Sequence, residues 1–237
     1  MPLPKIKPGE HVLVAGQTGS GKTVLLQELI RKSEVAPVFI IDSKGDNGFL
    51  TLARPDETLI IYGNSPGENC EHFFSWIQQP SRKIPEYVVI RPPFDEVTEP
   101  GILDLYVLNI YKYFKGPCIV VVDELYMLHK SGRCGPGVSA MLTRGRSQGK
   151  SLYGATQRPA WISGFCLSEA TYYFIFRLLD INDRKRLTHI GFETKTLLDK
   201  FHYYEYSSNE GGVYQPPLEL TFQSGETGNF NNSSRWL

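Results

Sequence analysis

The stretch that decides the fold is Gly16-Gln17-Thr18-Gly19-Ser20-Gly21-Lys22-Thr23. It fits the Walker A pattern G-x-x-x-x-G-K-[ST], follows the β-rich run His11–Ala15 directly, and opens the helical stretch Lys22–Lys32. Glycines allow the tight bend that turns backbone N–H groups toward phosphate oxygens, and a helix N-terminus favours an anion. In this pattern Lys22 reaches the β- and γ-phosphates, and the Thr23 hydroxyl binds Mg²⁺. The stretch therefore predicts a nucleotide-phosphate site formed by all eight residues.

A second element of the same site is the apolar strand Cys118–Glu124, which ends in two acids. This is the form of a Walker B element, in which Asp123 holds Mg²⁺ and Glu124 polarises the attacking water. A carboxylate base directly after the Mg²⁺ acid favours ATP hydrolysis over a kinase or a GTP switch. We therefore expect a Mg²⁺-dependent ATPase that converts ATP to ADP and phosphate.

The run Ser151–Thr156 is followed by the amide Gln157. An amide at a strand end can lie beside the γ-phosphate, where it orients water or reports the nucleotide state. The pattern by itself favours a loop residue that caps a strand. We predict the catalytic role for Gln157 because the two other elements accompany it.

Short β-rich runs alternate with helical stretches, which indicates an α/β domain with a largely parallel sheet flanked by helices. Most of the runs lack period-two polarity, as expected for strands buried on both faces. The runs are His11–Ala15, Val38–Asp42, Thr58–Tyr62, Tyr87–Arg91, Cys118–Asp123, Ser151–Thr156 and Tyr172–Leu178. Helices are expected at Lys22–Lys32, Ile102–Phe114, Val138–Arg146 and Asp180–Ile190.

The carboxyl-terminal part of the chain has a different character. The runs Phe201–Tyr206 and Gly212–Tyr214 flank Asn209-Glu210-Gly211-Gly212, which predicts a short terminal β-hairpin. The residues after Phe222 are polar and rich in Gly, Asn and Ser, as in a flexible tail that ends in Trp236-Leu237. We therefore expect an ATPase domain over residues 1–221 and a tail over 222–237, whose last two residues either dock on a neighbour or are disordered.

Composition limits the class of protein. The chain has 237 residues and a net charge of zero, with 25 basic and 25 acidic side chains, so no global basic field attracts DNA. The four scattered cysteines show no metal-ligand spacing, which favours reduced thiols. No signal peptide or membrane span is evident. We expect a soluble, non-secreted protein without a transmembrane segment.

Together these elements resemble the FtsK/HerA superfamily of DNA-translocating ATPases, from about residue 8 to residue 190. The most specific features are Gln157 within Ala155-Thr156-Gln157-Arg158-Pro159 and the turn Ile41-Asp42-Ser43-Lys44-Gly45-Asp46. The resemblance implies a P-loop NTPase fold of the RecA/ASCE type and a ring, usually a hexamer, with ATP bound between subunits. It also implies a catalytic arginine donated by the neighbouring subunit, for which Arg146 holds the matching position. Arg144, Arg158 and Arg177 are the weaker candidates.

The compact size is similar to that of the genome-packaging ATPases of membrane-containing icosahedral viruses, which belong to the same superfamily. That resemblance implies double-stranded DNA as the substrate track, capsid or membrane-vertex proteins as partners, and a location in the host cytoplasm and at the packaging vertex of the virion. The loop His129–Gly137 carries Lys130 and Arg133 and is the candidate DNA contact, although an ordinary surface connection fits it as well.

Other functions remain open at this level. Within the enzyme class, the alternatives are a cellular HerA-like translocase or a conjugation coupling ATPase. From a different class, the chain could be a nucleotide-regulated assembly ATPase that does not move DNA, and a metabolic kinase is a more distant alternative. Stacking of single-stranded bases on Tyr172–Phe176 is disfavoured, because that run has the apolar character of a core strand. The run Phe201–Tyr206 is undecided between stacking and core.

Overall fold

The computed structural model describes residues 3–45, 48–52, 55–62, 68–79, 83–99, 101–130, 132–192, 198–210, 213–214 and 218–220. The helices are α1 Lys22–Arg31, α2 Glu68–Gln78, α3 Phe94–Thr98, α4 Ile102–Tyr113, α5 Pro136–Arg144, α6 Gly164–Glu169 and α7 Ile181–Thr188. The strands are β1 Val12–Ala15, β2 Val38–Ile41, β3 Thr58–Tyr62, β4 Tyr87–Arg91, β5 Cys118–Val122, β6 His129–Lys130, β7 Arg133–Cys134, β8 Lys150–Thr156, β9 Tyr172–Phe176, β10 His202–Ser207, β11 Val213–Tyr214 and β12 Leu218–Glu219.

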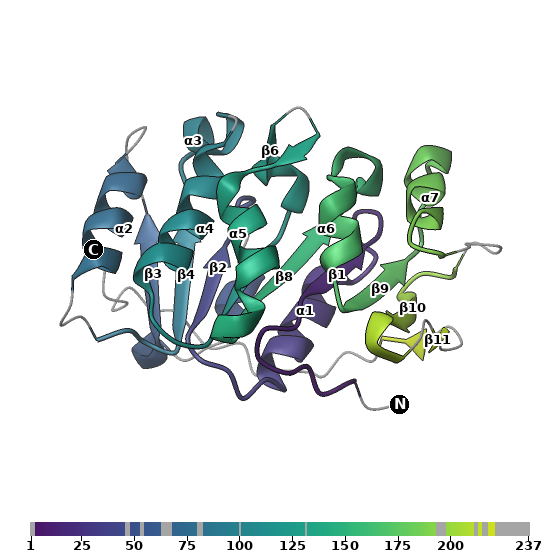
Figure 1. Ribbon diagram of the computed structural model, residues 1–237, viewed down its shortest axis with the longest axis horizontal. Coiled ribbons are helices and arrows are strands. Elements are labelled where there is room, and N and C mark those ends of the chain that lie inside the picture. The colour runs from purple at the N-terminus through teal and green to yellow at the C-terminus, as the bar shows by residue number, and fades with distance from the viewer. Residues whose placement is uncertain are drawn as a thin grey trace.

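One sheet organises the molecule, with the strand order β11-β10-β9-β1-β8-β5-β2-β4-β3 and β12 paired to β10 (Figure 1). The strands from β3 to β9 in that order run parallel, and β10 joins β9 antiparallel. Because parallel strands need crossover connections, helices are placed over the sheet. Figure 1 shows α2, α4, α5 and α6 ranged side by side across one face.

The apolar strands are buried on both faces. In β5, Cys118, Val120 and Val122 point into one core cluster, while Ile119 and Val121 point into the other. The first cluster includes Tyr106 of α4 and Met141 of α5, and the second includes Leu25 of α1. This two-sided burial explains why the central strands have a continuous apolar sequence rather than an alternating one.

Strand β8 lies between β1 and β5, although both precede it in the chain. Its register pairs Thr156 with Ala15 on one side and Gly154 with Val122 on the other. All three strands therefore end at the same edge of the sheet. The segments that follow their carboxyl ends are the phosphate loop, Gln157 and the acid pair Asp123-Glu124, so this strand order brings three separate sequence elements together.

The predicted α/β class with a mostly parallel sheet is confirmed, and the seven predicted runs correspond to strands of that sheet. The sequence did not predict α2, α3 or α6, nor the hairpin of β6 and β7. The carboxyl-terminal hairpin is present as β10 and β11. The proposed tail at 222–237 lies outside the described residues.

Candidate active site

The phosphate loop joins β1 to α1 and depends on its glycines for two reasons. A Cβ added to Gly16 would lie 2.6 Å from Cβ of Phe176 and 2.8 Å from Oγ of Ser20. Gly19 and Gly21 have φ angles of +72° and +106°, in the left-handed region that side chains disfavour. Close packing and positive φ together require glycine here, so the loop has the tight bend expected of a phosphate cradle.

Lys22 is the first residue of α1 and is only 5% exposed. Its Nζ donates a hydrogen bond to the carbonyl oxygen of Gln17, 3.0 Å away, across the loop. Burial, followed by the nearby Lys44 ammonium, lowers the pKa of Lys22 to about 8, while Glu124 and Asp123 oppose that change. The lysine is thus a poorly hydrated cation inside the loop, which favours binding of a polyanion.

The acid pair follows β5 and is almost completely buried, with Asp123 and Glu124 each 1% exposed. Among the described residues, Oδ1 of Asp123 and Oε2 of Glu124 have no hydrogen-bond partner. Burial raises the pKa of Glu124, against the opposing effect of the Gln157 N–H and the two lysines. Buried carboxylate oxygens without donors are unfavourable unless a cation or a reacting group uses them.

Lys44 lies at this site, although the sequence analysis assigned it no role beyond its place in the turn Ile41–Asp46. Its Nζ lies 2.8 Å from Oδ2 of Asp123 and 3.8 Å from Oε2 of Glu124. The turn is held by Asp42, which accepts hydrogen bonds from Gly45 N at 3.0 Å and from Arg91 Nε at 3.0 Å. The signal present in the sequence was a lysine just past the carboxyl end of a predicted strand.

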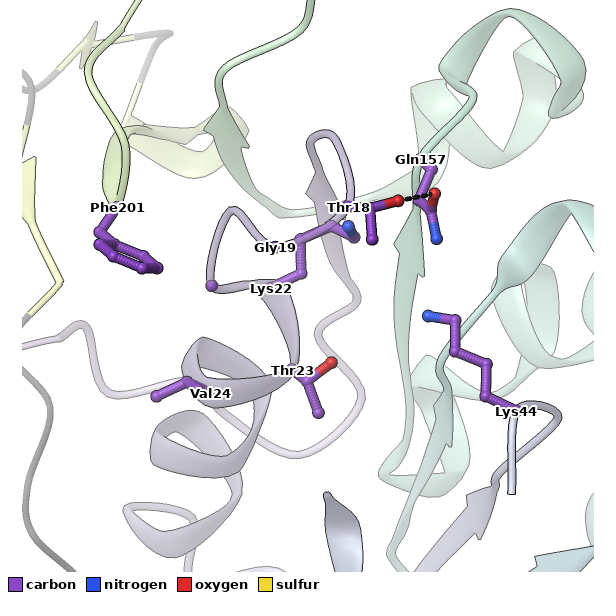
Figure 2. Close-up of a pocket in the computed structure, with 9 residues that line it drawn as sticks. Thr18, Gly19, Lys22, Thr23, Val24, Lys44, Gln157 and Phe201 are labelled. Carbon is purple, nitrogen blue, oxygen red and sulfur yellow. Dashed lines mark hydrogen bonds between the residues drawn. The ribbon is translucent and has the colours of Figure 1, made fainter. Parts of the chain in front are cut away.

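Gln157 connects the loop to the acids. The Thr18 hydroxyl donates to Oε1 of Gln157 at 2.6 Å, as Figure 2 shows, and the Gln157 N–H donates to Oε1 of Glu124 at 3.0 Å. The predicted sensor residue therefore contacts both the phosphate loop and the predicted general base. Gln157 therefore links the two, with its side-chain carbonyl on the phosphate loop and its backbone N–H on Glu124.

Residues of the phosphate loop, together with Lys44 and Gln157, surround an open cavity of about 320 Å³ (Figure 2). Its lining is Thr18, Gly19, Gly21, Lys22, Thr23, Val24, Lys44, Gln157 and Phe201. The Thr23 hydroxyl and the unpartnered Asp123 oxygen are hard oxygen donors of the kind that Mg²⁺ prefers, so these residues fit that ion. The arrangement suits binding of a nucleotide phosphate chain with its divalent cation.

Arg146 lies away from this cavity. It precedes β8, whereas Gln157 follows it, and seven strand residues separate the two by roughly 20 Å. The Arg146 side chain is exposed and its Nη2 donates to Oγ1 of Thr171 at 2.9 Å. Arg146 is thus at the amino edge of the sheet and does not contact the phosphate loop of the same chain.

The other arginines differ in their surroundings. Arg144 is exposed at the end of α5. Arg158 pairs with Asp180 at 3.1 Å and Asp183 at 3.3 Å. The Arg177 side chain is half-buried, and the backbone carbonyl oxygen of Arg177 accepts the Gln17 N–H at 3.0 Å. Arg158 is therefore committed to contacts within its own chain, which disfavours a role in a neighbouring site.

The candidate DNA loop is a small antiparallel hairpin of β6 and β7, with His129 paired to Cys134. Arg133 is exposed on it. The half-buried ring of His129 donates from Nδ1 to the carbonyl oxygen of Leu125 at 2.8 Å, and its Nε2 lies 3.3 Å from Sγ of Cys166. The base of the hairpin is thus anchored to the segment that follows Glu124, while Arg133 faces solvent.

Two aromatic runs have different environments. Tyr172–Phe176 is buried throughout as β9, which confirms that it is a core strand. The run Phe201–Tyr206 alternates between buried and half-buried positions as β10 begins, and Phe201 lines the cavity. The sequence left the second run undecided, because it does not show which side of the strand packs against the rest of the protein.

Among the described residues, no helix combines the length and the apolar character needed to cross a membrane. No protein-family model matches the chain. The chain is 27% identical over 223 residues to the DNA packaging ATPase P9 of Enterobacteria phage PRD1, covering 87% of each protein.

Solved structures show the same fold. The DNA-packaging ATPase B204 from Sulfolobus turreted icosahedral virus aligns with a TM-score of 0.62 and 17% identity, over 91% of this chain and 100% of that one. The bacterial conjugative coupling protein TrwB aligns with a TM-score of 0.63 and 14% identity, over 93% and 88% of the two chains. In sequence and in fold, the chain resembles viral genome-packaging ATPases, which is the resemblance that its motifs predict.

Proposed function

We propose that this chain is the ATP-hydrolysing subunit of a ring motor that packages a double-stranded DNA genome into a preformed viral capsid. The observation that carries the proposal is that Lys22 and Gln157 line one cavity while Glu124 accepts the Gln157 N–H, with all three at the carboxyl ends of adjacent strands. The similarity to the packaging ATPase of phage PRD1 supports DNA as the cargo.

Hydrolysis follows from the chemistry of these side chains. Lys22 and the loop N–H groups neutralise the β- and γ-phosphates, and Thr23 with Asp123 would hold Mg²⁺, which supplies further positive charge at those oxygens. Glu124 accepts a proton from the water that attacks the γ-phosphorus, while the bond to the ADP oxygen breaks. Gln157 orients that water through the same side chain that contacts Thr18.

Arg146 is the proposed contribution of the neighbouring subunit. It is exposed at the amino edge of the sheet, on the far side from its own cavity. In a closed ring, preferably a hexamer, a head-to-tail contact presents that edge of one subunit to the carboxyl edge of the next. The guanidinium then stabilises charge on the transferring phosphoryl group.

DNA contact is proposed for the β6–β7 hairpin, with Lys130 and Arg133 as phosphate ligands that do not read sequence. The neutral chain is compatible with this role, because a ring multiplies each hairpin's charges around one channel. Such a motor acts in the host cytoplasm and at the packaging vertex, where capsid or membrane-vertex proteins are its partners.

The test is ATP hydrolysis by the purified protein with and without long double-stranded DNA, beside Lys22→Ala and Arg146→Ala. We expect DNA to stimulate the wild type, both variants to be inactive, and a mixture of the two to regain activity. Mixing restores an interface that has an intact lysine on one side and an intact arginine on the other. Hydrolysis that is indifferent to DNA, with wild-type behaviour of Arg146→Ala, would overturn the motor and favour an assembly ATPase.

A further inference from the structure

The nucleotide cavity has two chemically different ends. Gln157 and Lys44 lie on one side of Lys22, whereas Phe201 and Val24 lie on the other (Figure 2). The first end adjoins the acid pair, through the Gln157 N–H and the Lys44 ammonium. The second end presents an aromatic ring and a branched aliphatic side chain, neither of which is suited to bind phosphate.

Phe201 is held at this second end by the backbone. It immediately precedes β10, and the neighbouring Tyr203 is paired with Phe176 of β9. Its own carbonyl oxygen accepts the N–H of Leu220 at 2.9 Å. The φ angle of Phe201 is +64°, in the left-handed region. This conformation costs a non-glycine residue roughly 1–2 kcal/mol. Unfavourable backbone conformations of this kind are concentrated at ligand-binding positions.

The ring also lies against the phosphate loop. A Cβ built on Gly21 would be 3.5 Å from Cδ1 of Phe201 and 2.7 Å from Cδ2 of Leu220. Gly21 is the residue before Lys22, and both line the same cavity as Phe201, so the ring lies beside the loop next to the residue that anchors the phosphates. A group joined to the phosphate chain at this end is therefore within reach of the ring.

The direction of the bound nucleotide follows from these positions. The γ-phosphate must lie toward Glu124 and Gln157, because the attacking water is activated there in the function proposed above. The phosphate chain is anchored at Lys22, and the nucleoside must extend toward the opposite end. We propose that Phe201 is the platform on which the base of the bound nucleotide stacks, with Val24 lining the same end of the cavity. This inference rests on the proposed nucleotide hydrolysis and adds the base-binding residue to it.

The experiment compares a ligand that has a base with one that has only the phosphate chain. The probes are β,γ-methylene ATP, which is not hydrolysed, and inorganic tripolyphosphate, both with Mg²⁺ and measured by calorimetry. Phe201→Gly removes the ring and suits the positive φ, so its backbone is not strained. Phe201→Trp retains a stacking surface. Phe94→Ala is the matched control, because Phe94 is an aromatic side chain that is 78% exposed and does not line the cavity.

We expect Phe201→Gly to weaken binding of β,γ-methylene ATP by roughly 5- to 100-fold, the range for loss of one base–aromatic stack. Tripolyphosphate affinity should change less than about twofold, Phe201→Trp should stay within about threefold for both probes, and Phe94→Ala should match the wild type. Thermal unfolding establishes that each variant is folded. If Phe201→Gly lost affinity for both probes equally, the ring would only support the loop. If its affinity for both probes were unchanged, Phe201 would not belong to the site. Either result overturns the proposal. If the wild type binds neither probe, the proposed ATPase itself fails.

Discussion

The ammonium nitrogen of Lys44 lies 2.8 Å from Oδ2 of Asp123, although the two residues follow different strands. The contact arises because β2 and β5 are adjacent and parallel, with Ile41 paired to Val122. The residues just beyond these strand ends therefore meet at the sheet edge. Lys44 supplies the positive charge that a buried Asp123 requires when no divalent cation is bound.

Removal of this ammonium should destabilise the nucleotide-free protein. In Lys44→Met, Asp123 and Glu124 lose one of their two nearby lysines, and we expect the free energy of unfolding to fall by about 1–2 kcal/mol, since Lys44 is partly hydrated. Added Mg²⁺ should stabilise this variant more than the wild type, because the ion replaces the lost charge. Equilibrium urea unfolding with and without Mg²⁺ measures both effects.

Lys44→Arg is the control for that experiment, because it retains the charge and a long side chain. It should be closer to the wild type than Lys44→Met in stability and in its response to Mg²⁺. Lys44→Met that unfolds like the wild type, with the same response to the ion, would show that Lys44 does not balance the acid pair.

The hydrogen bond between Thr18 and Gln157 should couple the two residues in catalysis. We expect Thr18→Val and Gln157→Ala each to lower kcat/KM, and the double variant to be little worse than Gln157→Ala alone. The resulting coupling free energy should be about 1 kcal/mol, since both single changes remove the same bond. A double-mutant cycle of steady-state hydrolysis measures it.

Gln148 is the control for this cycle, because it is an exposed glutamine at the opposite end of β8. The effects of Thr18→Val and Gln148→Ala should add. Additive effects of Thr18→Val and Gln157→Ala would mean that the bond has no role during turnover.

The sequence predicted those parts of the site in which the chemistry is local. Lys22 and Thr23 are adjacent in one loop, and Asp123 and Glu124 end one strand, so the spacing alone predicts them as site residues. The contact of Thr18 with Gln157 joins residues 139 positions apart. It depends on the strand order, which neither motif indicates. Lys44 was missed for the same reason, because its role depends on which strand is the neighbour of β2.

The helices show a similar limit. α2 was not predicted because its large apolar residues are confined to Phe73–Ile77, a stretch of little more than one turn. The short β6 and β7 have only two residues each, too few for any pattern. Phe201 is placed at the cavity by the pairing of β10 with β9, a long-range contact that an aromatic-rich run cannot reveal.

Asp104 should be a large contributor to stability without taking part in catalysis. This buried carboxylate on α4 accepts the N–H groups of Gly137 at 2.7 Å and Val138 at 2.8 Å, in the first turn of α5. Asp104→Ala leaves both donors unpaired, and we expect it to lower the free energy of unfolding by about 2–3 kcal/mol. Equilibrium urea unfolding measures the change.

Asp95→Ala is the matched control, because Asp95 is exposed in the first turn of α3. It should change stability by less than about 0.5 kcal/mol. Affinity of folded Asp104→Ala for β,γ-methylene ATP should equal that of the wild type, since α5 does not line the cavity. If Asp104→Ala were as stable as the wild type, Asp104 would not be a cap of α5.

His11 should make stability depend on pH below neutrality. The side chain is 2% exposed, and its Nδ1 accepts the Leu152 N–H at 3.1 Å. Burial, and then the positive charge of Arg146, lowers the pKa of His11 from its ordinary 6.5 to about 4. Between these values the unfolded chain binds a proton that the folded chain does not. Stability from this residue is therefore complete above pH 6.5 and is lost as pH falls toward 4, by about 3 kcal/mol in total.

His11→Asn isolates this effect, because the amide oxygen can accept the Leu152 N–H and does not titrate. The difference in unfolding free energy between wild type and His11→Asn should shrink as pH falls from 6.5 to 4, measured by urea unfolding at a series of pH values. Arg146 and Glu169 line the same 230 Å³ cavity as His11, and Arg146→Ala should make the slope shallower by removing the like charge. A difference between wild type and His11→Asn that is independent of pH would show that His11 does not remain neutral in the folded chain.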